Sequence, residues 1–135
     1  MSASILVVED NRDNMNLMEY LLRAFGYTPL LASSGAKGIR LAAERNPDVI
    51  LMDVQMPEMD GYEATAMIKR DPELARTPII AVTAFAMVGD GDRILASGFD
   101  GYISKPITPE TFVGEVEAFL PEQKRVGRVA SVDAR

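Results

Sequence analysis

The stretch Val49-Ile50-Leu51-Met52-Asp53 decides the fold of this chain of 135 residues. It is a short aliphatic run that follows Pro47 and Asp48, and such a run is typical of a central strand buried on both faces of a sheet. Burying a charge at the end of such a strand costs free energy unless the charge is paired, so a charged residue at this place is expected to have a function. Asp53 is therefore the first candidate for a functional residue.

Three other apolar runs also end in polar side chains. The polar residues that follow these runs are Glu9 with Asp10, then Thr83, then Lys105. In a parallel α/β sheet, the ligand crevice lies at the carboxyl ends of the strands. The sequence therefore predicts that a carboxylate cluster, a hydroxyl group and an ammonium group meet at one edge of a sheet.

The pattern along the chain alternates strand with helix. Strands are expected over residues 4–8, 27–32, 49–53, 78–83 and 101–104, and helices over 13–25, 34–45, 62–70, 87–96 and from 108 onward. Gly89 and Gly91 weaken the fourth helix by about 1 kcal/mol each relative to alanine. Short loops and right-handed crossovers then give an α/β fold, a doubly wound five-stranded parallel sheet with five helices.

Length and composition indicate one domain, over residues 1–121, followed by a flexible basic tail over residues 122–135. The net charge of the chain is −6 although its tail is basic, which argues against a nucleic-acid surface on the domain. No apolar run approaches the roughly 20 residues of a membrane span, and the N-terminus lacks a secretory signal. We therefore expect a cytoplasmic protein that contacts neither nucleic acid nor membrane.

The chain has no histidine and no cysteine, which removes the commonest general base and all thiol chemistry. Crowded carboxylates at Glu9, Asp10 and Asp53 would raise one another's pKa unless a cation balanced them. Mg²⁺ suits a shallow oxygen site of this kind, because it keeps several waters and takes further ligands from phosphate. With Lys105 and Thr83 beside it, one carboxylate is suited to attack a phosphoryl group.

These motifs resemble those of the receiver domain of two-component response regulators, in the same order and over residues 4 to about 120. They are Glu9-Asp10, Asp53, the loop Met56-Pro57-Glu58-Met59-Asp60-Gly61, Thr83-Ala84 and Lys105-Pro106. Within the family, the segments around Asp10, Thr83 and Lys105 look most like stand-alone DivK-type cell-cycle regulators. Receivers attached to hybrid histidine kinases look similar. The resemblance implies a flavodoxin-like, and more closely a CheY-like, form of the predicted fold.

The resemblance implies that Asp53 accepts a phosphoryl group from a phosphohistidine. The donor would be a sensor histidine kinase or a histidine phosphotransferase, and the chain itself would not be an enzyme beyond its own phosphorylation and dephosphorylation. Mg²⁺ would be bound by Glu9, Asp10, Asp53 and the backbone carbonyl of Gln55.

The resemblance also implies a switch. Thr83 would hydrogen-bond the phosphoryl group and move toward it, and Lys105 would pair with the same group. Tyr102 would turn inward when Thr83 moves, and the bond between Lys105 and Pro106 would be a cis peptide bond. The changed surface of the fourth and fifth helices would then be recognised by a downstream protein.

Two other classes of function are compatible with parts of the pattern. An enzyme of the haloacid dehalogenase type also uses an aspartyl nucleophile, but it has a second aspartate two positions later, where this chain has Gln55. A flavodoxin-like binder would hold a nucleotide at the same edge of the sheet. Such a binder has a glycine-rich phosphate loop after the first strand, where this chain has Glu9, Asp10 and Asn11.

Overall fold

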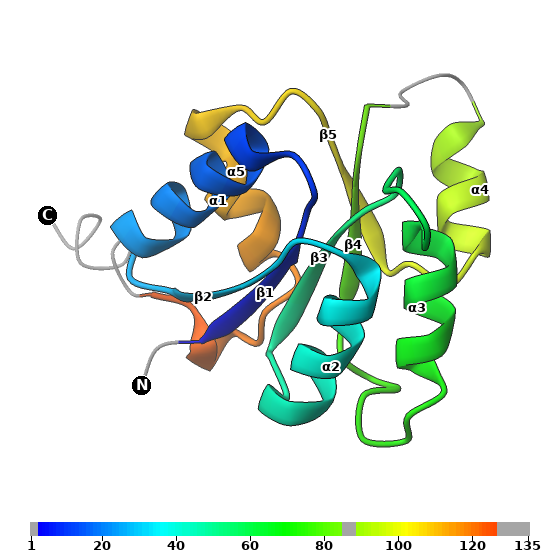
Figure 1. Ribbon diagram of the computed structural model, residues 1–135. Coiled ribbons are helices and arrows are strands. Elements are labelled where there is room, and N and C mark those ends of the chain that lie inside the picture. The colour runs from blue at the N-terminus through cyan, green and yellow to red at the C-terminus, as the bar shows by residue number, and fades with distance from the viewer. Residues whose placement is uncertain (1–2, 85–88, 127–135) are drawn as a thin grey trace, which may run out of the picture.

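A computed structural model describes residues 3–84 and 89–126 of the chain. Its centre is one sheet of five parallel strands in the order β2-β1-β3-β4-β5 (Figure 1). The strands are β1 (Ser4–Val8), β2 (Thr28–Ala32), β3 (Val49–Asp53), β4 (Ile79–Thr83) and β5 (Gly101–Ser104). The predicted α/β fold with a five-stranded parallel sheet is therefore confirmed.

The described residues form five α-helices. They are α1 (Arg12–Ala24), α2 (Gly35–Arg45), α3 (Gly61–Lys69), α4 (Asp90–Ala96) and α5 (Pro109–Glu117), and a short 3-10 helix, η1 (Glu122–Lys124), follows them. The expected helix over 87–96 is shorter, because α4 begins after Gly89, which has a left-handed φ of 93°. Residues 85–88 lie outside the described residues. None of the described helices combines the length and the apolar composition of a membrane span.

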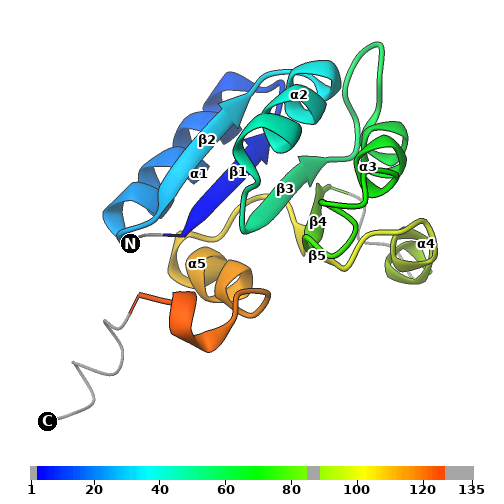
Figure 2. The same ribbon diagram turned by 90° about the horizontal axis from the view of Figure 1, so that it is seen from below.

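Helices cover both faces of the sheet (Figures 1 and 2). α1 and α5 pack on one face, and α2, α3 and α4 pack on the other. Along β1, Ile5 and Val7 face the first group of helices, and Leu6 and Val8 face the second. β3 and β4 are buried at every position, which explains why their sequences are continuously apolar until their last residues.

Side-chain caps fix the start of the three helices that follow β1, β2 and β3. The Asn11 side chain accepts a hydrogen bond from the Asn14 N–H at 2.9 Å, and Ser34 caps α2 in the same way. α3 begins with a capping box, in which the side chains of Asp60 and Glu63 each accept from the other's backbone. Such caps satisfy the free N–H groups of a helix start. They also hold the loops at the carboxyl ends of the strands in place.

Residues 122–126, which the sequence predicts as the start of a flexible tail, contact the domain. Lys124 Nζ lies 2.6 Å from Asp48 Oδ1, at the edge of the sheet opposite the polar strand ends. Val126 packs against the core between α1 and α5, and its N–H donates to the Tyr27 hydroxyl at 2.9 Å. The described part of the predicted tail therefore lies against the domain. Residues 127–135 lie outside the described residues.

Gly61 lets α3 begin directly against the end of β3. A Cβ atom at this position would lie 2.9 Å from Val54 Cα and closer still to the Asp53 carbonyl oxygen. The Gly61 N–H donates to the Val54 carbonyl at 2.9 Å. The neighbouring atoms are backbone, so they cannot turn aside as a flexible side chain would. The glycine thereby fixes the loop that follows Asp53.

We predict that Gly61→Ala lowers the free energy of unfolding by roughly 1–3 kcal/mol, the usual cost of overpacking a tight contact. The matched control is Gly114→Ala in α5, where an added Cβ meets nothing within 4 Å. That variant gains helix propensity and becomes more stable by up to about 1 kcal/mol. Urea denaturation measures both changes, and an equal stability of the two variants would contradict the prediction.

Candidate functional site

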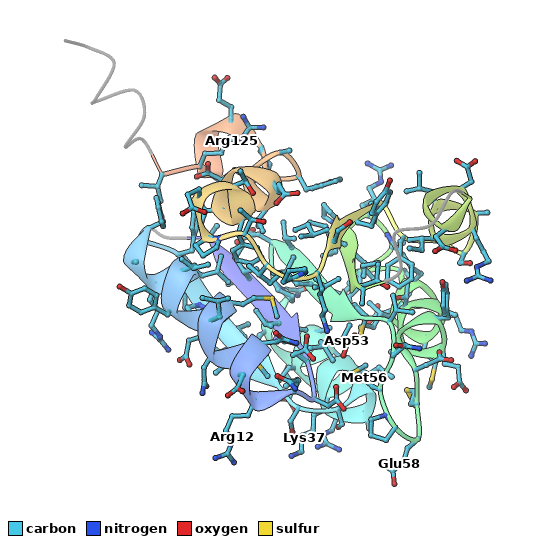
Figure 3. The ribbon with its side chains drawn as sticks, turned by 90° about the horizontal axis from the view of Figure 1, so that it is seen from above. Arg12, Lys37, Asp53, Met56, Glu58 and Arg125 are labelled. Atoms are coloured by element: carbon cyan, nitrogen blue, oxygen red, sulfur yellow. The ribbon has the colours of Figure 1, made fainter. Side chains whose placement is uncertain are left out.

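The register of the sheet brings the polar strand ends to one place. Glu9 directly follows the residue of β1 that pairs with Met52, and Asp53 is the next residue of β3. Lys105 directly follows the residue of β5 that pairs with Thr83. Figure 3 looks down on this edge of the sheet and shows Asp53 near its centre. The predicted meeting of carboxylates, hydroxyl and ammonium is therefore present in the structure.

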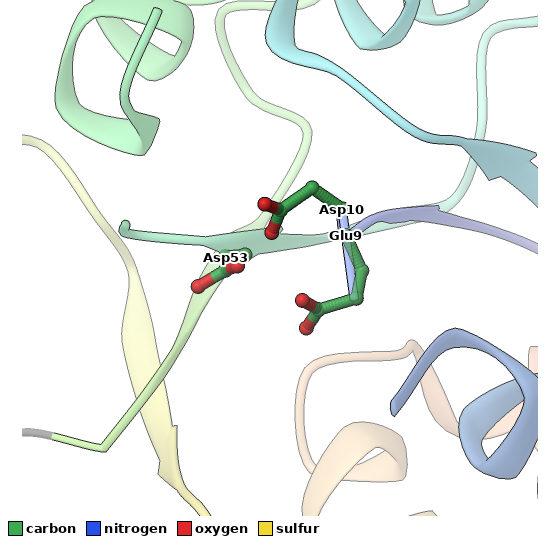
Figure 4. A group of neighbouring side chains, drawn as sticks. All are labelled: Glu9, Asp10 and Asp53. Atoms are coloured by element: carbon green, nitrogen blue, oxygen red, sulfur yellow. The ribbon is translucent and has the colours of Figure 1, made fainter. Parts of the chain in front are cut away.

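Three carboxylates point toward one another at this edge (Figure 4). Glu9, Asp10 and Asp53 each offer an oxygen, and these oxygens all lie within 4.8 Å of one another. The exposed fraction is 1% for Glu9 and 5% for Asp53, whereas Asp10 is exposed. The cluster therefore has a buried floor and one side that is open to solvent.

The Lys105 ammonium group contacts the buried part of this cluster. Its Nζ lies 3.1 Å from Glu9 Oε1 and 3.4 Å from Asp53 Oδ1. The peptide bond from Lys105 to Pro106 is cis, as the resemblance implies. When all three carboxylates are ionised, one positive charge faces three negative charges, so the group as a whole remains negative.

Backbone N–H groups hold the two buried carboxylates. Glu9 Oε2 accepts from the Asn11 N–H at 3.1 Å, and Asp53 Oδ1 accepts from the Gln55 N–H at 3.2 Å. In both cases the donor lies two residues further along the chain, in the loop after the strand. Each loop therefore folds back over the carboxylate that precedes it and fixes its direction.

A cavity of about 240 Å³ opens beside these side chains. It is lined by Glu9, Asp10, Asn11, Asn14, Asp53, Gln55, Thr83, Ala84 and Lys105. The sequence assigns no role to Asn11 and Asn14, although they form the N-terminal cap of α1 directly after Asp10. A capping residue that directly follows a functional carboxylate is the signal that could have identified them.

Tyr102 does not line this cavity. It lies in β5, and 45% of its surface is exposed, whereas Thr83 in the neighbouring strand is 2% exposed. Its neighbour Ile103 faces the core between α1 and α5. Because side chains alternate along a strand, the Tyr102 ring lies on the side of the sheet that carries α4.

Burial raises the pKa of Asp53 from 3.8 to about 7. A hydrogen bond with Glu9 and repulsion by its charge act in the same direction, and so does Asp10, while the positive charge of Lys105 lowers the pKa. Asp53 in the protein alone therefore loses its proton near neutral pH. A further cation beside the cluster would favour the ionised form.

The donor set of the cluster fits a hard divalent cation. Its ligand atoms are carboxylate oxygens, one side is open to solvent, and the adjoining cavity has room for water molecules. These are the features of a magnesium site, in which a few carboxylates bind an ion that keeps several waters. Within residues 3–84 and 89–126, no other group of three acidic side chains lies this close together.

The chain belongs to the response regulator receiver domain family, whose sequence model matches residues 5–117. It is 47% identical over 120 residues to the polar-differentiation response regulator DivK of Brucella ovis and to that of Brucella suis. The alignment with each of these covers 89% of this chain and 98% of the relative. The predicted resemblance to receivers of two-component signalling, and to DivK in particular, is confirmed.

Solved structures of receivers have the same fold. The chemotaxis protein CheY4 of Vibrio cholerae superimposes with a TM-score of 0.84 at 28% identity, over 89% of this chain and all of that one. The receiver domain of a sensor histidine kinase from Pseudomonas aeruginosa gives a TM-score of 0.81 at 36% identity, over 88% and 98% of the two chains. The fold is therefore CheY-like, and the chain is a receiver of two-component signalling.

We predict that Asp53 makes the metal-free protein less stable as the pH rises from about 4 to about 7. Its pKa is higher in the folded state, so folding holds a proton that the unfolded chain has already released, and raising the pH removes this contribution to stability. Asp53→Asn cannot titrate. Its stability relative to wild type should therefore rise by roughly 2–3 kcal/mol between pH 5 and pH 8, at about 1.4 kcal/mol per pKa unit.

Urea denaturation in EDTA at the two pH values measures this difference, with Asp60→Asn in the cap of α3 as the control for loss of one carboxylate. The addition of MgCl₂ at pH 8 should stabilise the wild type more than Asp53→Asn. If wild type and Asp53→Asn differ in free energy of unfolding by the same amount at pH 5 and pH 8, Asp53 titrates at its ordinary pKa and the prediction is wrong.

Proposed function

We propose that the chain is the phospho-accepting receiver of a two-component phosphorelay, with Asp53 as the phosphoacceptor and Mg²⁺ as the cofactor. The observation that carries this proposal is the place of the Asp53 carboxylate, between two further carboxylates and an ammonium group 3.4 Å away. Membership of the receiver family supports it. So does the receiver domain from Pseudomonas aeruginosa, which is described with a magnesium ion coordinated in its active site cleft.

The reaction is transfer of a phosphoryl group from a phosphohistidine to Asp53. An ionised oxygen of Asp53 attacks the phosphorus atom, a P–O bond forms and the P–N bond breaks. The imidazole nitrogen keeps the electron pair of the broken bond and takes up a proton. Because the chain has no histidine, the donor is a partner, either a sensor histidine kinase or a histidine phosphotransferase.

The residues around Asp53 prepare it for this reaction. Its pKa of about 7 means that Asp53 is protonated in about half of the molecules at neutral pH when no divalent cation is bound. Glu9, Asp10, Asp53 and the Gln55 carbonyl would hold Mg²⁺, which supplies positive charge that keeps Asp53 ionised and stabilises the phosphoryl oxygens. Glu9 also contacts Lys105 at 3.1 Å and thereby positions the ammonium group beside Asp53.

Lys105 and Thr83 would respond to the new phosphoryl group. Lys105 is already within 3.4 Å of Asp53, so a modest movement suffices for its ammonium group to pair with a phosphoryl oxygen. Thr83 lines the same cavity, and its hydroxyl group would donate a hydrogen bond to another phosphoryl oxygen. A phosphorylated side chain carries about −1.5 to −2 charges, which is a strong driving force for both movements.

The movement of Thr83 would be transmitted through Tyr102. Thr83 is 2% exposed and pairs with Ser104, two residues after Tyr102 in β5. Thr83 and Tyr102 therefore lie on the same side of the sheet, and displacement of Thr83 would open space toward Tyr102. The ring, now 45% exposed, would turn toward that space. The surface formed by α4, β5 and α5 would change, and a downstream protein would recognise the changed surface.

We predict that wild-type protein incubated with MgCl₂ and acetyl phosphate gains the mass of one phosphoryl group, because the site activates Asp53 toward small phosphodonors. Asp53→Asn should gain nothing, and EDTA should prevent the gain. Asp60→Asn is the matched control, since it removes another loop carboxylate outside the cluster and should still be labelled. Labelling of Asp53→Asn would contradict the assignment of the phosphoacceptor. Sustained turnover of phosphate esters would instead indicate a phosphatase.

We predict that Lys105→Ala slows this labelling by about ten-fold or more, because it removes the positive charge that faces the transferred oxygens. Lys124→Ala is the matched control, as it breaks a lysine–aspartate pair at the opposite edge of the sheet. The rate is measured as mass gain against time at saturating MgCl₂. Equal rates for the two lysine variants would contradict a role for Lys105 in the transfer.

A further inference from the structure

The Tyr102 ring lies directly on the backbone of α4 at Gly91. A Cβ atom built on Gly91 would lie 2.8 Å from Tyr102 Oη, 2.9 Å from Cε1 and 3.0 Å from Cζ. Real Cβ atoms essentially never approach other atoms this closely. Any side chain at position 91 would therefore occupy the place that the ring now occupies.

The backbone at Gly91 does not itself require glycine. Its φ is outside the left-handed range, whereas Gly89, two residues earlier, has a φ of 93° and an added Cβ there would meet nothing within 4 Å. Glycine in a helix costs up to about 1 kcal/mol relative to alanine. Gly89 therefore allows the left-handed backbone turn, whereas the glycine at position 91 leaves space for the Tyr102 ring.

Among the described residues, packing holds the Tyr102 ring where it is. Within residues 3–84 and 89–126, no hydrogen bond holds the Tyr102 hydroxyl, and 45% of the residue is exposed. α4 lies beside β5 (Figures 1 and 2) and is anchored there by Ile94, which is 2% exposed in the core. A side chain added at position 91 would thus displace the ring more easily than the helix.

We infer that Gly91 is a positioning residue for Tyr102. Gly91 forms the seat, which is the space beside α4 that holds the ring in its present, half-exposed position, here called the outward position. The inference rests on the proposed function insofar as Tyr102 acts there as the switching residue. The absence of a side chain at position 91 stabilises the outward state, so it keeps the unphosphorylated protein in that state. Any larger residue at this position biases the chain toward the state with the ring inward.

The first test follows the Tyr102 ring by NMR in the full chain with labelled tyrosine, and Tyr102→Phe identifies its signal. In unphosphorylated Gly91→Ala, the signal should move toward its position in wild type treated with acetyl phosphate and MgCl₂. The population of the displaced ring should rise about five-fold or more, as overpacking of this severity implies. Gly114→Ala, a helical glycine with open space around it, should leave the signal unchanged. No movement in Gly91→Ala, or movement in another direction, would overturn the inference.

The second test needs no phosphorylation. Gly91→Ala should lower the melting temperature in the wild-type background, because the methyl group and the ring compete for one place. In the Tyr102→Ala background the same substitution should be neutral or stabilising, since the ring is gone and alanine favours the helix. Equal destabilisation in both backgrounds would overturn the inference.

The two proposals fail separately. If acetyl phosphate and MgCl₂ add no mass at Asp53 of the wild type, the proposed function is wrong, yet the melting cycle still decides whether Gly91 seats the ring. If Asp53 is labelled normally and the melting cycle shows no coupling between positions 91 and 102, the seat is wrong and the phosphorylation chemistry stands.

Discussion

The contact of one ammonium group with two buried carboxylates is the constraint on which the site depends. Lys105 lies 3.1 Å from Glu9 and 3.4 Å from Asp53, and both carboxylates are almost fully buried. Buried charges are tolerated only when they are paired. Here the pairing is incomplete, because one ammonium group faces two buried carboxylates and the exposed carboxylate of Asp10 lies beside them. Burial is the largest cause of the raised pKa of Asp53, and the hydrogen bond with Glu9 and the charge of Glu9 act in the same direction. A bound cation would supply the missing positive charge. A phosphoryl group on Asp53 would add negative charge, which this cation and Lys105 would have to balance.

The surrounding backbone keeps these charges from moving apart. The caps at Asn11 and Asp60 fix the loops after β1 and β3, and Gly61 brings α3 against the carbonyl of Asp53. Hydrogen bonds from Asn11 and Gln55 direct the two buried carboxylates. The incomplete charge pairing therefore cannot relax by rearrangement of this side of the site. Protonation of Asp53 or a bound cation would relieve it.

The sequence predicts this side of the molecule well because its signals are local. A buried strand that ends in Asp53, and the order of the other strand ends, suffice to predict the sheet and the meeting of Glu9, Asp10, Thr83 and Lys105. The contacts that it misses are tertiary. The docking of Lys124 on Asp48 joins residues 76 positions apart, and no local pattern marks it. Gly91 likewise is predicted as a weak point in a helix, whereas its place beneath Tyr102 appears once the fold is known.

The surroundings of Thr83 toward β3 are held by more interactions than its surroundings toward β5, and this difference suits a conformational switch. Toward β3, the side chains are buried and bound by charges and backbone hydrogen bonds. Toward β5, the Tyr102 ring is held by contact with a glycine, and α4 has Ile94 as the one buried residue among its seven. A two-state equilibrium moves by the free energy that distinguishes its states. In the proposed function, charge added at Asp53 would act on the rigid side, and its effect would be expressed where the opposing contacts are weakest, at Tyr102 and α4.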